Sequence, residues 1–447
     1  MFEPLYTAAE MRAAEAGHDV KRLMERAGRS LAEFVLDEYG DADSITVVCG
    51  PGNNGGDGRV AAQVLRQADC DVRVVEAKPE DEEKDLGSPG LIVDALFGTG
   101  FSGEPRPGAA RLIEQMNGAD VDIVAVDIPS GVDASTGEVA AAVVDASSTV
   151  TFHREKVGLY VAPGSFHRGE IEIVDIGLED RETRFARPTA EILDRVPLRA
   201  PPDTKYTAGS VLVVGGSPGF TGAACLTARA AFRADAGYVA VAAPRASLPV
   251  LEQQLIEAVK RPLEDVWEAA GRARALALGP GLGRSDGARA LVRRLLEETD
   301  LPAVVDADAL FDLDPFARAA PTVLTPHSGE LGRLLDVEAS WVDAHRLEAA
   351  SRAVERFGCV VLLKGDGTIV AASGEQTLVC PGVPSLATAG TGDVLTGIIG
   401  SFLAKGMNAR LAAAAAATAH AEAAAEAPQR AGLVASDVVE MLPYVLG

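Results

Sequence analysis

The sequence SITVVCGPGNNGGDG, residues 44–58, decides the fold class of the first half of this chain. Residues 44–50 are an apolar, β-branched run that predicts a buried strand, and residues 59–67 predict a helix. The glycine-rich residues 50–58 between them predict a tight loop whose backbone can approach a ligand closely. Strand, glycine loop and helix in this order are typical of an α/β fold with a parallel sheet.

The same alternation continues on both sides of this stretch. Apolar residues at helical spacing between residues 8 and 38 predict a helical segment before it. Strands are predicted after it at residues 72–76, 91–95, 123–127 and 148–152. Because strands that alternate with helices form a parallel sheet covered on both faces, we predict a Rossmann-like, three-layer α/β/α domain over residues 1–198.

A second α/β pattern follows a proline-rich segment. Residues 194–203 contain three prolines and predict an interdomain linker. Beyond it we predict a second α/β/α domain over residues 199–447. It opens with a strand at 211–214, a glycine turn at 215–219 and a helix at 221–236. The later elements are strands at 239–243, 275–278, 303–306, 322–324, 360–364 and 368–372 and an alanine-rich helix at 409–427.

The sequence AGTGD, residues 389–393, is the strongest chemical motif of the second half. It precedes an apolar run, residues 394–399, that predicts a helix. Glycines at a helix start leave several backbone N–H groups pointing at one spot that attracts phosphate. Asp393 places a carboxylate beside that spot, so the motif suits phosphoryl transfer to an alcohol. An alternative is that Asp393 only caps the helix.

Three loops that follow predicted strands carry polar side chains in the first half. Asn53, Asn54 and Asp57 lie on the first loop, residues 94–104 form the second and residues 127–133 form the third. Loops at the carboxyl ends of parallel strands gather at one edge of the sheet, so we expect the three to converge on a ligand. Their oxygen atoms suit an alkali or alkaline-earth cation rather than a transition metal. A glycine turn without function is the alternative for the first loop.

The second half adds polar loops of its own. Residues 279–283 form a glycine loop, and residues 306–310 place two carboxylates at a strand end. His327 follows Thr-Pro on a loop, and we favour a site role over a structural one. Lys364 ends an apolar strand next to glycine. It either balances the acidic charge or, as we favour, contacts a nucleotide.

Composition excludes several classes of partner. The net charge of −24 would repel the phosphates of nucleic acid, and no apolar run is long enough to cross a bilayer. The N-terminus lacks the features of a signal peptide, so we expect a cytoplasmic protein. The five scattered cysteines predict free thiols rather than disulfides or zinc. The acidic excess fits either adaptation to high intracellular salt or an ordinary acidic protein.

The first half resembles the NAD(P)H-hydrate epimerases. GPGNNGGDG, DALFGTG and DIPSGVD occur in the family's order between about residues 5 and 180. The resemblance implies epimerisation at C6 of a hydrated nicotinamide ring and a K⁺ site formed by Asn54, Asp94 and Ser130. It also implies Asp127 as acid or base, and substrate contacts by Asn53, Asn54, Gly55, Gly56, Asp57, Gly98, Thr99, Gly100, Phe101, Ser102, Gly103, Glu104 and Asp127.

The second half resembles the ribokinase-like ADP- or ATP-dependent NAD(P)H-hydrate dehydratases. The motifs GGS, GPGLG, DADAL, TPHSGE, LKG and GTGD follow in the family's order over about residues 203–445. Phe311 stands where the family commonly has asparagine, and Val383 where it commonly has asparagine in Gly-Asn-Pro-Gly. The resemblance implies Asp393 as the base, with Mg²⁺ bound. It implies nucleotide contacts by Lys364, Gly365, Asp366, Gly367, Thr368, Gly390, Thr391 and Gly392, and substrate contacts by Ala223, Gly283, His327 and Asp393.

Together the two resemblances predict a bifunctional repair enzyme for hydrated NAD(P)H, written NAD(P)HX. One half would interconvert the C6 epimers, and the other would dehydrate the S form through phosphorylation and elimination at C6. Prokaryotic members generally use ADP, and we expect a homo-oligomer. The alternatives are a ribokinase-like kinase of a vitamin precursor with an N-terminal ligand-binding domain, or an N-terminal half that only binds or regulates.

Overall fold

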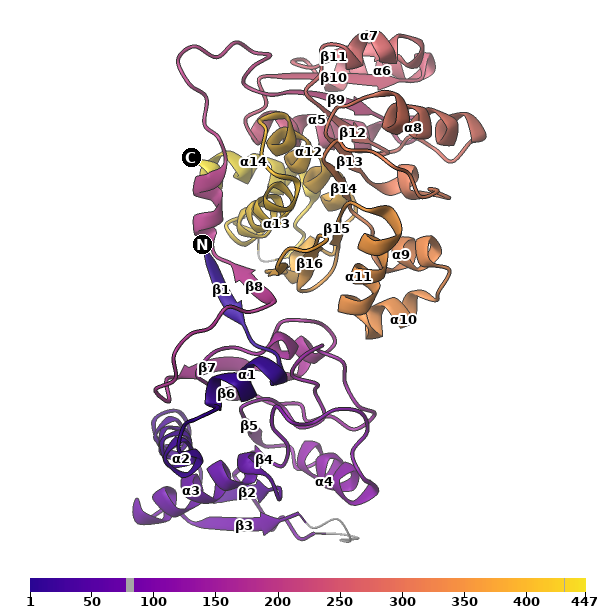
Figure 1. The fold of residues 1–447 in the computed structure, drawn as a ribbon. Helices are drawn as coiled ribbons and strands as arrows, with labels where there is room; N and C mark the ends of the chain where they lie inside the picture. Colours follow the sequence, from indigo (N-terminus) through magenta and orange to yellow (C-terminus); the bar gives the residue numbers. More distant parts are fainter. Residues whose placement is uncertain (78–83, 430) are drawn as a thin grey trace. The chain divides into compact units, whose positions relative to one another are not determined.

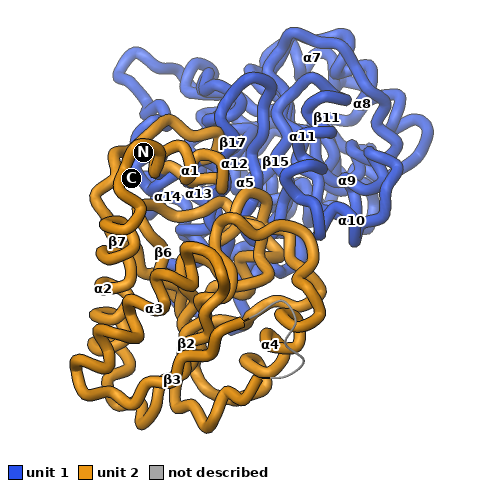
Figure 2. Tube along the Cα trace, turned by 60° about the horizontal axis from the view of Figure 1, so that its bottom comes forward, with its two compact units in different colours: residues 1–3, 186–447 blue, residues 4–185 orange. Residues whose placement is uncertain are grey.

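The computed structural model describes residues 1–77, 84–429 and 431–447, which form two compact units (Figure 2). The N-terminal unit is Pro4–Phe185, and the C-terminal unit is Ala186–Gly447 together with Met1–Glu3. The division lies ahead of the predicted boundary between residues 198 and 199. The short helix at Ala190–Arg195, whose last two residues fall in the predicted linker, packs on the C-terminal helix α13 (Ala409–Ala425) with Ile192 fully buried. Burial of this apolar side chain ties the segment to the C-terminal unit.

The N-terminal unit is built on one sheet of six parallel strands in the order β3-β2-β4-β5-β6-β7 (Figure 1). All five strands predicted in the first half have bounds within one residue of observed ones. The strand at Glu170–Val174, β7, was not predicted because, as a largely exposed strand at the sheet edge, it lacks the continuous apolar run of the buried strands. The other bounds are Ile45–Cys49 for β2, Val72–Glu76 for β3, Leu91–Ala95 for β4, Asp122–Val126 for β5 and Ser148–Phe152 for β6.

The helical segment at the N-terminus is two helices rather than one. Helix α1 spans Ala8–Glu15 and α2 spans Val20–Glu38. The break contains Gly17 at φ +88°, a backbone conformation that few other residues adopt. Asp19 then caps α2 by accepting from the N–H groups of Lys21 and Arg22.

The helix after β2 begins earlier than predicted. Helix α3 spans Asn53–Gln67, so most of the expected glycine loop forms the first turns of the helix. The prediction that the helix starts at residue 59 is wrong because these glycines serve close packing. A Cβ on Gly55 would lie 1.9 Å from the carbonyl oxygen of Gly50, and one on Gly58 would lie 2.5 Å from the Cβ of Ala95. Asn54 and Asp57 therefore sit three residues apart on one helix face.

The C-terminal unit is built on an eleven-stranded sheet in the order β1-β8-β17-β16-β15-β14-β13-β12-β9-β10-β11. The strands from β15 to β11 are parallel, whereas β16 and β17 pair antiparallel. Of these strands, the four that the sequence did not predict, β1, β8, β11 and β17, are short. Bounds are Phe2–Leu5 (β1), Phe185–Pro188 (β8), Ser210–Val214 (β9), Tyr238–Ala243 (β10), Val259–Pro262 (β11), Ala275–Leu278 (β12), Ala303–Val305 (β13), Thr322–Leu324 (β14), Val360–Leu363 (β15), Thr368–Ala371 (β16) and Thr377–Cys380 (β17).

Helices cover both faces of this sheet. Figure 1 shows α12, α13 and α14 gathered on one side and α8, α9 and α11 on the other. Bounds are Thr221–Arg233 (α5), Leu248–Gln254 (α6), Val266–Ala270 (α7), Asp286–Glu298 (α8), Ser328–Leu335 (α9), Ala339–Ala344 (α10), Arg346–Phe357 (α11), Thr391–Ala404 (α12) and Ala435–Leu446 (α14); helix α4 of the N-terminal unit spans Pro107–Asn117.

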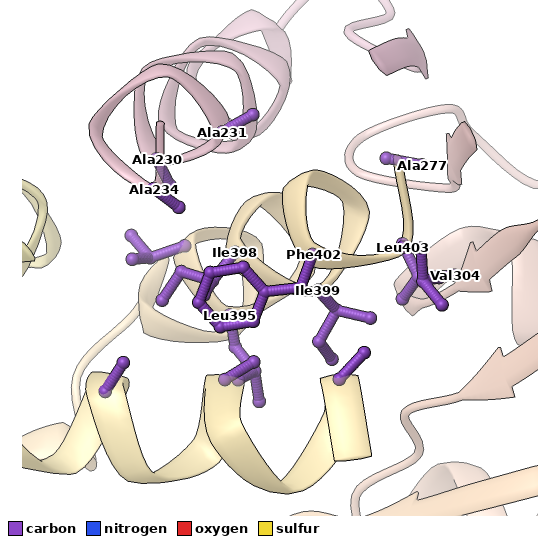
Figure 3. Packing of buried hydrophobic residues seen from close by; sticks show 14 of the residues in the cluster. Ala230, Ala231, Ala234, Ala277, Val304, Leu395, Ile398, Ile399, Phe402 and Leu403 are labelled. Carbon is purple, nitrogen blue, oxygen red and sulfur yellow. The ribbon is translucent and has the colours of Figure 1, made fainter. Parts of the chain in front are cut away.

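Helix α12, which carries the AGTGD motif at its start, is packed tightly into the core. Ile398 and Phe402 of α12 belong to the same buried cluster as Ala230 of α5 and Ala234 at its C-cap (Figure 3). A Cβ on Gly397 would lie 2.3 Å from the carbonyl oxygen of Thr227 in α5. This close approach fixes the position of the first turn of α12 relative to α5.

Two further sequence expectations can be compared with the structure. Within residues 1–77, 84–429 and 431–447, none of the helices combines the length and hydrophobicity needed to cross a membrane. All five cysteines are free thiols, and Cys49, Cys225 and Cys380 are buried. The expectation of unpaired cysteines is therefore confirmed, although Cys70 and Cys359 are only partly buried.

Candidate functional site

The N-terminal unit holds a cavity of about 720 Å³ at the carboxyl ends of β2, β4 and β5. This size is typical of a small-molecule site, and its place at the strand ends is where open α/β sheets bind ligands. The expected contacts that line it are Asn53, Asn54, Asp57, Gly98, Thr99, Gly100, Phe101, Ser102, Glu104 and Asp127.

Three of the expected substrate contacts, Gly55, Gly56 and Gly103, are not among the residues that line the cavity. Gly55 packs against the backbone of Gly50, and a Cβ on Gly56 would lie 2.5 Å from the sulfur of Met24. Gly103 adopts φ +74° in the loop before α4. These glycines shape the backbone that carries the lining residues.

The three expected K⁺ ligands are brought together through Phe97. The Asn54 amide donates to the carbonyl oxygen of Phe97 at 2.7 Å, and the Phe97 N–H donates to Ser130 Oγ at 2.8 Å. Ser130 in turn donates to both carboxylate oxygens of Asp94, through Oγ at 2.7 Å and through N–H at 2.8 Å. Segments after β2, β4 and β5 thus meet in one hydrogen-bonded cluster.

The chemistry of this cluster fits a monovalent cation. Asp94 is fully buried, and burial raises its pKa to about 6, against the opposing effect of the Ser130 hydrogen bonds. A bound cation would compensate this buried charge. Asn54, Asp94 and Ser130 offer amide, carboxylate and hydroxyl oxygens. These hard ligands suit K⁺ better than they suit a softer transition metal.

Asp127, the expected acid or base, is held by a lysine that sequence reasoning missed. It adopts φ +68° directly after β5, and its Oδ1 lies 2.5 Å from the Nζ of Lys156. Lys156 is fully buried and also donates to Thr151 Oγ1 at 2.9 Å and to the Phe152 carbonyl at 2.7 Å. The available signal was a lysine four residues beyond the strand 148–152, at the ligand-binding edge of the sheet.

Two more carboxyl groups line the same cavity. Burial raises the pKa of Asp57 to about 8, and the negative charges of Asp127 and Glu15 add to that shift. Burial and the charge of Asp127 also raise the pKa of Glu15, which lies on α1. Glu15 was not predicted, because nothing in its helical segment indicated that α1 reaches the strand ends.

In the C-terminal unit, the ends of β13 and β15 meet through an ion pair. Lys364 Nζ lies 2.7 Å from Asp306 Oδ1 and 3.8 Å from a carboxylate oxygen of Glu330. The other oxygen of Asp306 accepts from Thr396 Oγ1 at 2.7 Å. Although burial opposes it, the charges of Asp306 and Glu330 raise the pKa of Lys364, so this lysine stays an ammonium.

The AGTGD motif lies directly beside this ion pair. Gly390 is the N-cap of α12 at φ +91°, and a Cβ on Gly392 would lie 3.5 Å from Lys364 Nζ and 3.9 Å from Asp306 Oδ2. Burial raises the pKa of Asp393 to about 7, with the charge of Asp306 adding to the shift and that of Lys364 opposing it. The site therefore combines the free N–H groups of a helix start, an ammonium and a carboxyl group able to gain or lose a proton near neutral pH.

Two expected substrate contacts are connected to this motif. The hydroxyl of Thr227 lies 3.0 Å from the carbonyl oxygens of Ala223 and Asp393, which links α5 to α12. The N–H of Gly283 donates to Asp308 at 2.9 Å. The negative charge of Asp308 also contributes to the raised pKa of Asp393.

The other predicted contacts occupy two loops. His327 caps α9, with its Nδ1 accepting from the Gly329 N–H at 3.0 Å, and its side chain is 56% exposed. The capping bond gives His327 the structural role that we had favoured less, while its exposure leaves the ring accessible. Gly365, Asp366 and Gly367 lie in the turn between β15 and β16, and Thr368, the first residue of β16, donates through Oγ1 to the Gly365 carbonyl at 2.9 Å.

Comparison with known proteins agrees with this geometry. Residues 211–443 match the family model described as NAD(P)H-hydrate dehydratase, and residues 20–88 and 75–158 match that of the YjeF-related protein N-terminus. The bifunctional NAD(P)H-hydrate repair enzyme Nnr of Moorella thermoacetica is 36% identical to this chain, over 99% of this chain and 96% of that protein. The chain belongs to the family of bifunctional NAD(P)H-hydrate repair enzymes. Both resemblances indicated by the motifs are therefore confirmed.

Further members and solved structures support the assignment to this repair-enzyme family. The Escherichia coli repair enzyme Nnr is 35% identical, over 87% of this chain and 81% of its own length. The ADP/ATP-dependent NAD(P)H-hydrate dehydratase of Bacillus subtilis, co-crystallised with ATP/Mg²⁺, has a TM-score of 0.53 and 30% identity, covering 57% of this chain and 96% of that one. A ribokinase-like superfamily protein of Enterococcus faecalis, with a TM-score of 0.54, 23% identity and coverage of 60% of this chain and 97% of that one, shows the same fold. The predicted ribokinase-like architecture is thus confirmed.

Proposed function

We propose that the N-terminal unit interconverts the two C6 epimers of NAD(P)HX, and that the C-terminal unit dehydrates the S epimer to NAD(P)H with ADP as phosphoryl donor. The observation that carries the dehydratase proposal is the position of Asp393 and Gly392 beside Lys364 and Asp306. Family membership supports a division of two activities between the two units.

In the C-terminal unit, Asp393 takes the proton of the C6 hydroxyl. The oxygen then receives the phosphoryl group, whose charge is stabilised by the N–H groups of residues 390–392 and by the ammonium of Lys364. Phosphate is a far better leaving group than hydroxide. The N1 lone pair expels phosphate by forming an N1–C6 double bond, and loss of a proton from C5 restores the dihydropyridine of NAD(P)H.

A magnesium ion would be held at this site mainly through the nucleotide. Asp306 is already bonded to Lys364 and Thr396, and Asp308 to Arg284 and Gly283. Among the described residues, no three His, Cys, Asp or Glu side chains form a metal-binding group. This fits Mg²⁺, which is commonly bound by one or two carboxylates together with phosphate oxygens. Its chemistry there is to neutralise charge on the transferring phosphoryl group.

In the N-terminal unit, Asp127 moves a proton at the C6 hydroxyl of the substrate. Asp127 lines the same cavity as the loop of residues 98–104, whose Phe101 ring stacks on Phe97 at 4.8 Å between centroids. Glu104 anchors this loop by accepting from the N–H of Ala141 at 3.0 Å. We infer that Asn54, Asp94 and Ser130 would hold K⁺, which would supply positive charge to the buried carboxylate of Asp94.

One assay tests the proposal. Purified full-length protein is mixed with both NADHX epimers and either ADP or ATP, and NADH is followed by its absorbance. Complete conversion of both epimers with release of free phosphate supports both activities. Faster conversion with ADP than with ATP supports ADP as the phosphoryl donor. Accumulation of a phosphorylated product without NADH would instead identify a small-molecule kinase. Conversion of only one epimer would indicate an N-terminal unit that binds without catalysis.

A further inference from the structure

Four ionisable groups from separate segments meet at one end of the N-terminal cavity. Glu15 lies on α1, Asp57 on α3 and Asp127 after β5, and all three line the cavity. Lys156 lies behind them, fully buried, with its ammonium 2.5 Å from Asp127. The proposed function uses only Asp127, so the other groups need an explanation.

The charges at this end of the cavity do not balance if every carboxyl group is ionised. Three carboxylates would face the ammonium of Lys156 and the guanidinium of Arg12, which lines the cavity and acts on Glu15, and like charges in a buried site cannot all be maintained. Lys156 and Asp127 form an ion pair. Among the described residues, none donates a hydrogen bond to the Asp57 carboxyl group, and its pKa is raised to about 8 by burial. Asp57 is accordingly the group that holds a proton at neutral pH.

Building on the proposed function, we propose that Asp57 and Asp127 are a catalytic acid–base pair that epimerises C6 by opening the ring, and that Lys156 is a positioning residue for Asp127. Asp127 removes the C6 hydroxyl proton, and the O–H electron pair forms a C6=O bond. The C6–N1 bond breaks, and its electron pair stays on N1, which takes the proton of Asp57. The product is an open-chain aldehyde with a secondary amine.

Closing the ring reverses these transfers. Rotation about the C5–C6 bond presents the other face of the aldehyde to N1. Asp57 takes back its proton as N1 attacks the carbonyl carbon, and Asp127 returns its proton to the oxygen. The pair ends in its starting state, and neither water nor any other reactant enters the balance. Opening the ring requires one carboxylate and one carboxylic acid at the same time, which is the state that the ion pair of Asp127 with Lys156 and the burial of Asp57 favour.

The position of Lys156 explains why it acts through Asp127. Its three donors are directed to Asp127, to Thr151 Oγ1 and to the Phe152 carbonyl, so its amino group faces protein rather than the cavity. It is absent from the residues that line the cavity. Replacing it should slow proton transfer without weakening substrate binding.

Isotope incorporation tests the bond that breaks. Full-length protein converts a purified NADHX epimer in H₂¹⁸O, the other epimer is separated by chromatography, and its ¹⁸O content is corrected for a reaction without protein. Ring opening predicts that the C6 oxygen is retained. One ¹⁸O atom per conversion would overturn it in favour of loss and return of water, while leaving the epimerase function intact. Absence of any conversion would overturn both the ring-opening mechanism and the epimerase function.

Variants test the roles of the residues. Asp57→Asn and Lys156→Met are each expected to lower kcat for epimer exchange about 100-fold or more, with KM within about threefold, because a positioned proton-transfer group contributes at least that factor. Lys156→Arg should restore part of the loss. Asp145→Asn, at an exposed carboxylate paired with His167, is the matched control and should retain full activity.

The folded state of each variant is checked by its thermal unfolding and by its ADP-dependent NADH formation from the S epimer. A folded Asp57→Asn variant with kcat near that of the native protein would overturn the acid role. A Lys156→Met variant that raises KM but keeps kcat would overturn the positioning role.

Discussion

Lys364 and Asp306 form an ion pair of 2.7 Å that joins the ends of β15 and β13 across the intervening β14. This pair supports our proposal that Asp393, rather than Asp306, is the base of the C-terminal site. Asp306 is committed to Lys364 and to Thr396, whereas Asp393, one turn before Thr396, has its pKa raised to about 7. A carboxyl group in that state can accept a proton from an alcohol near neutral pH.

The dehydratase activity should therefore depend on pH through Asp393. Its pKa of about 7 means that the carboxylate form is scarce at pH 6 and dominant at pH 8. We expect kcat/KM for ADP-dependent NADH formation to rise with pH through about 7 and to level above it. The measurement is a rate profile from pH 5.5 to 9 with the S epimer alone. A flat profile would contradict the role of Asp393.

Removal of the Asp393 carboxylate should separate the two activities. Asp393→Asn keeps the size of the side chain but cannot take the hydroxyl proton. We expect NADH formation to fall by at least about 100-fold, the usual effect of losing a general base, while epimer exchange continues. Chromatography of the epimers and NADH absorbance give the two readouts. Loss of both activities in a folded variant would show that the units do not act independently.

The buried carboxyl group of Asp57 should make stability depend on pH. Its pKa is about 8 in the folded state against an ordinary value of 3.8, so the folded protein retains a proton that the unfolded chain releases. This cost to stability grows as pH rises from about 4 to 8, by at most about 1.4 kcal/mol per pH unit. Asp57→Asn removes that cost, so its gain in the free energy of unfolding should be larger at pH 7 than at pH 5. Urea unfolding at the two pH values measures it, and an equal gain at both would count against the raised pKa.

The close packing of α12 on α5 predicts a sensitive glycine. In Gly397→Ala the new Cβ would meet the Thr227 carbonyl oxygen at 2.3 Å, so the helix must move. We expect a loss of about 1–3 kcal/mol in the free energy of unfolding, together with reduced dehydratase activity, since Asp393 lies on the same helix. Gly287→Ala in α8 is the matched control, because its Cβ meets only Ser285 Oγ at 3.9 Å. Similar behaviour of both variants in urea unfolding would contradict the packing argument.

Potassium should affect only the N-terminal activity. If Asn54, Asp94 and Ser130 hold K⁺, replacing K⁺ in the buffer by a large organic cation leaves the buried Asp94 charge without compensation. We expect slower epimer exchange and a lower Tm for the N-terminal unit, both restored by added KCl. The same effect of NaCl and KCl would show a general response to salt, and no effect of either would contradict the cation site.

Much of the fold and part of the sites follow from local sequence patterns. Apolar runs such as residues 275–278 and 322–324 match strands because a parallel strand is buried on both faces. The polar loops at 94–104 and 127–133 meet at one cavity because parallel strands end at a common sheet edge. The start of α3 was misplaced because glycines indicate a loop locally. Their use here, close packing against β2 and β4, depends on elements that a local pattern does not contain.

The sequence by itself determined the alternation of strands and helices in both halves, the two motif sets and, with the family resemblance they carry, Asp127 and Asp393 as candidate bases. Only the tertiary structure decided which cation pairs with which carboxylate: Lys156 with Asp127, and Lys364 with Asp306. It also decided which carboxyl groups retain a proton. The reason is that a pKa depends on burial and on charges a few ångströms away, and the neighbouring charges of Asp57 and Asp393 include groups contributed by distant segments of the chain.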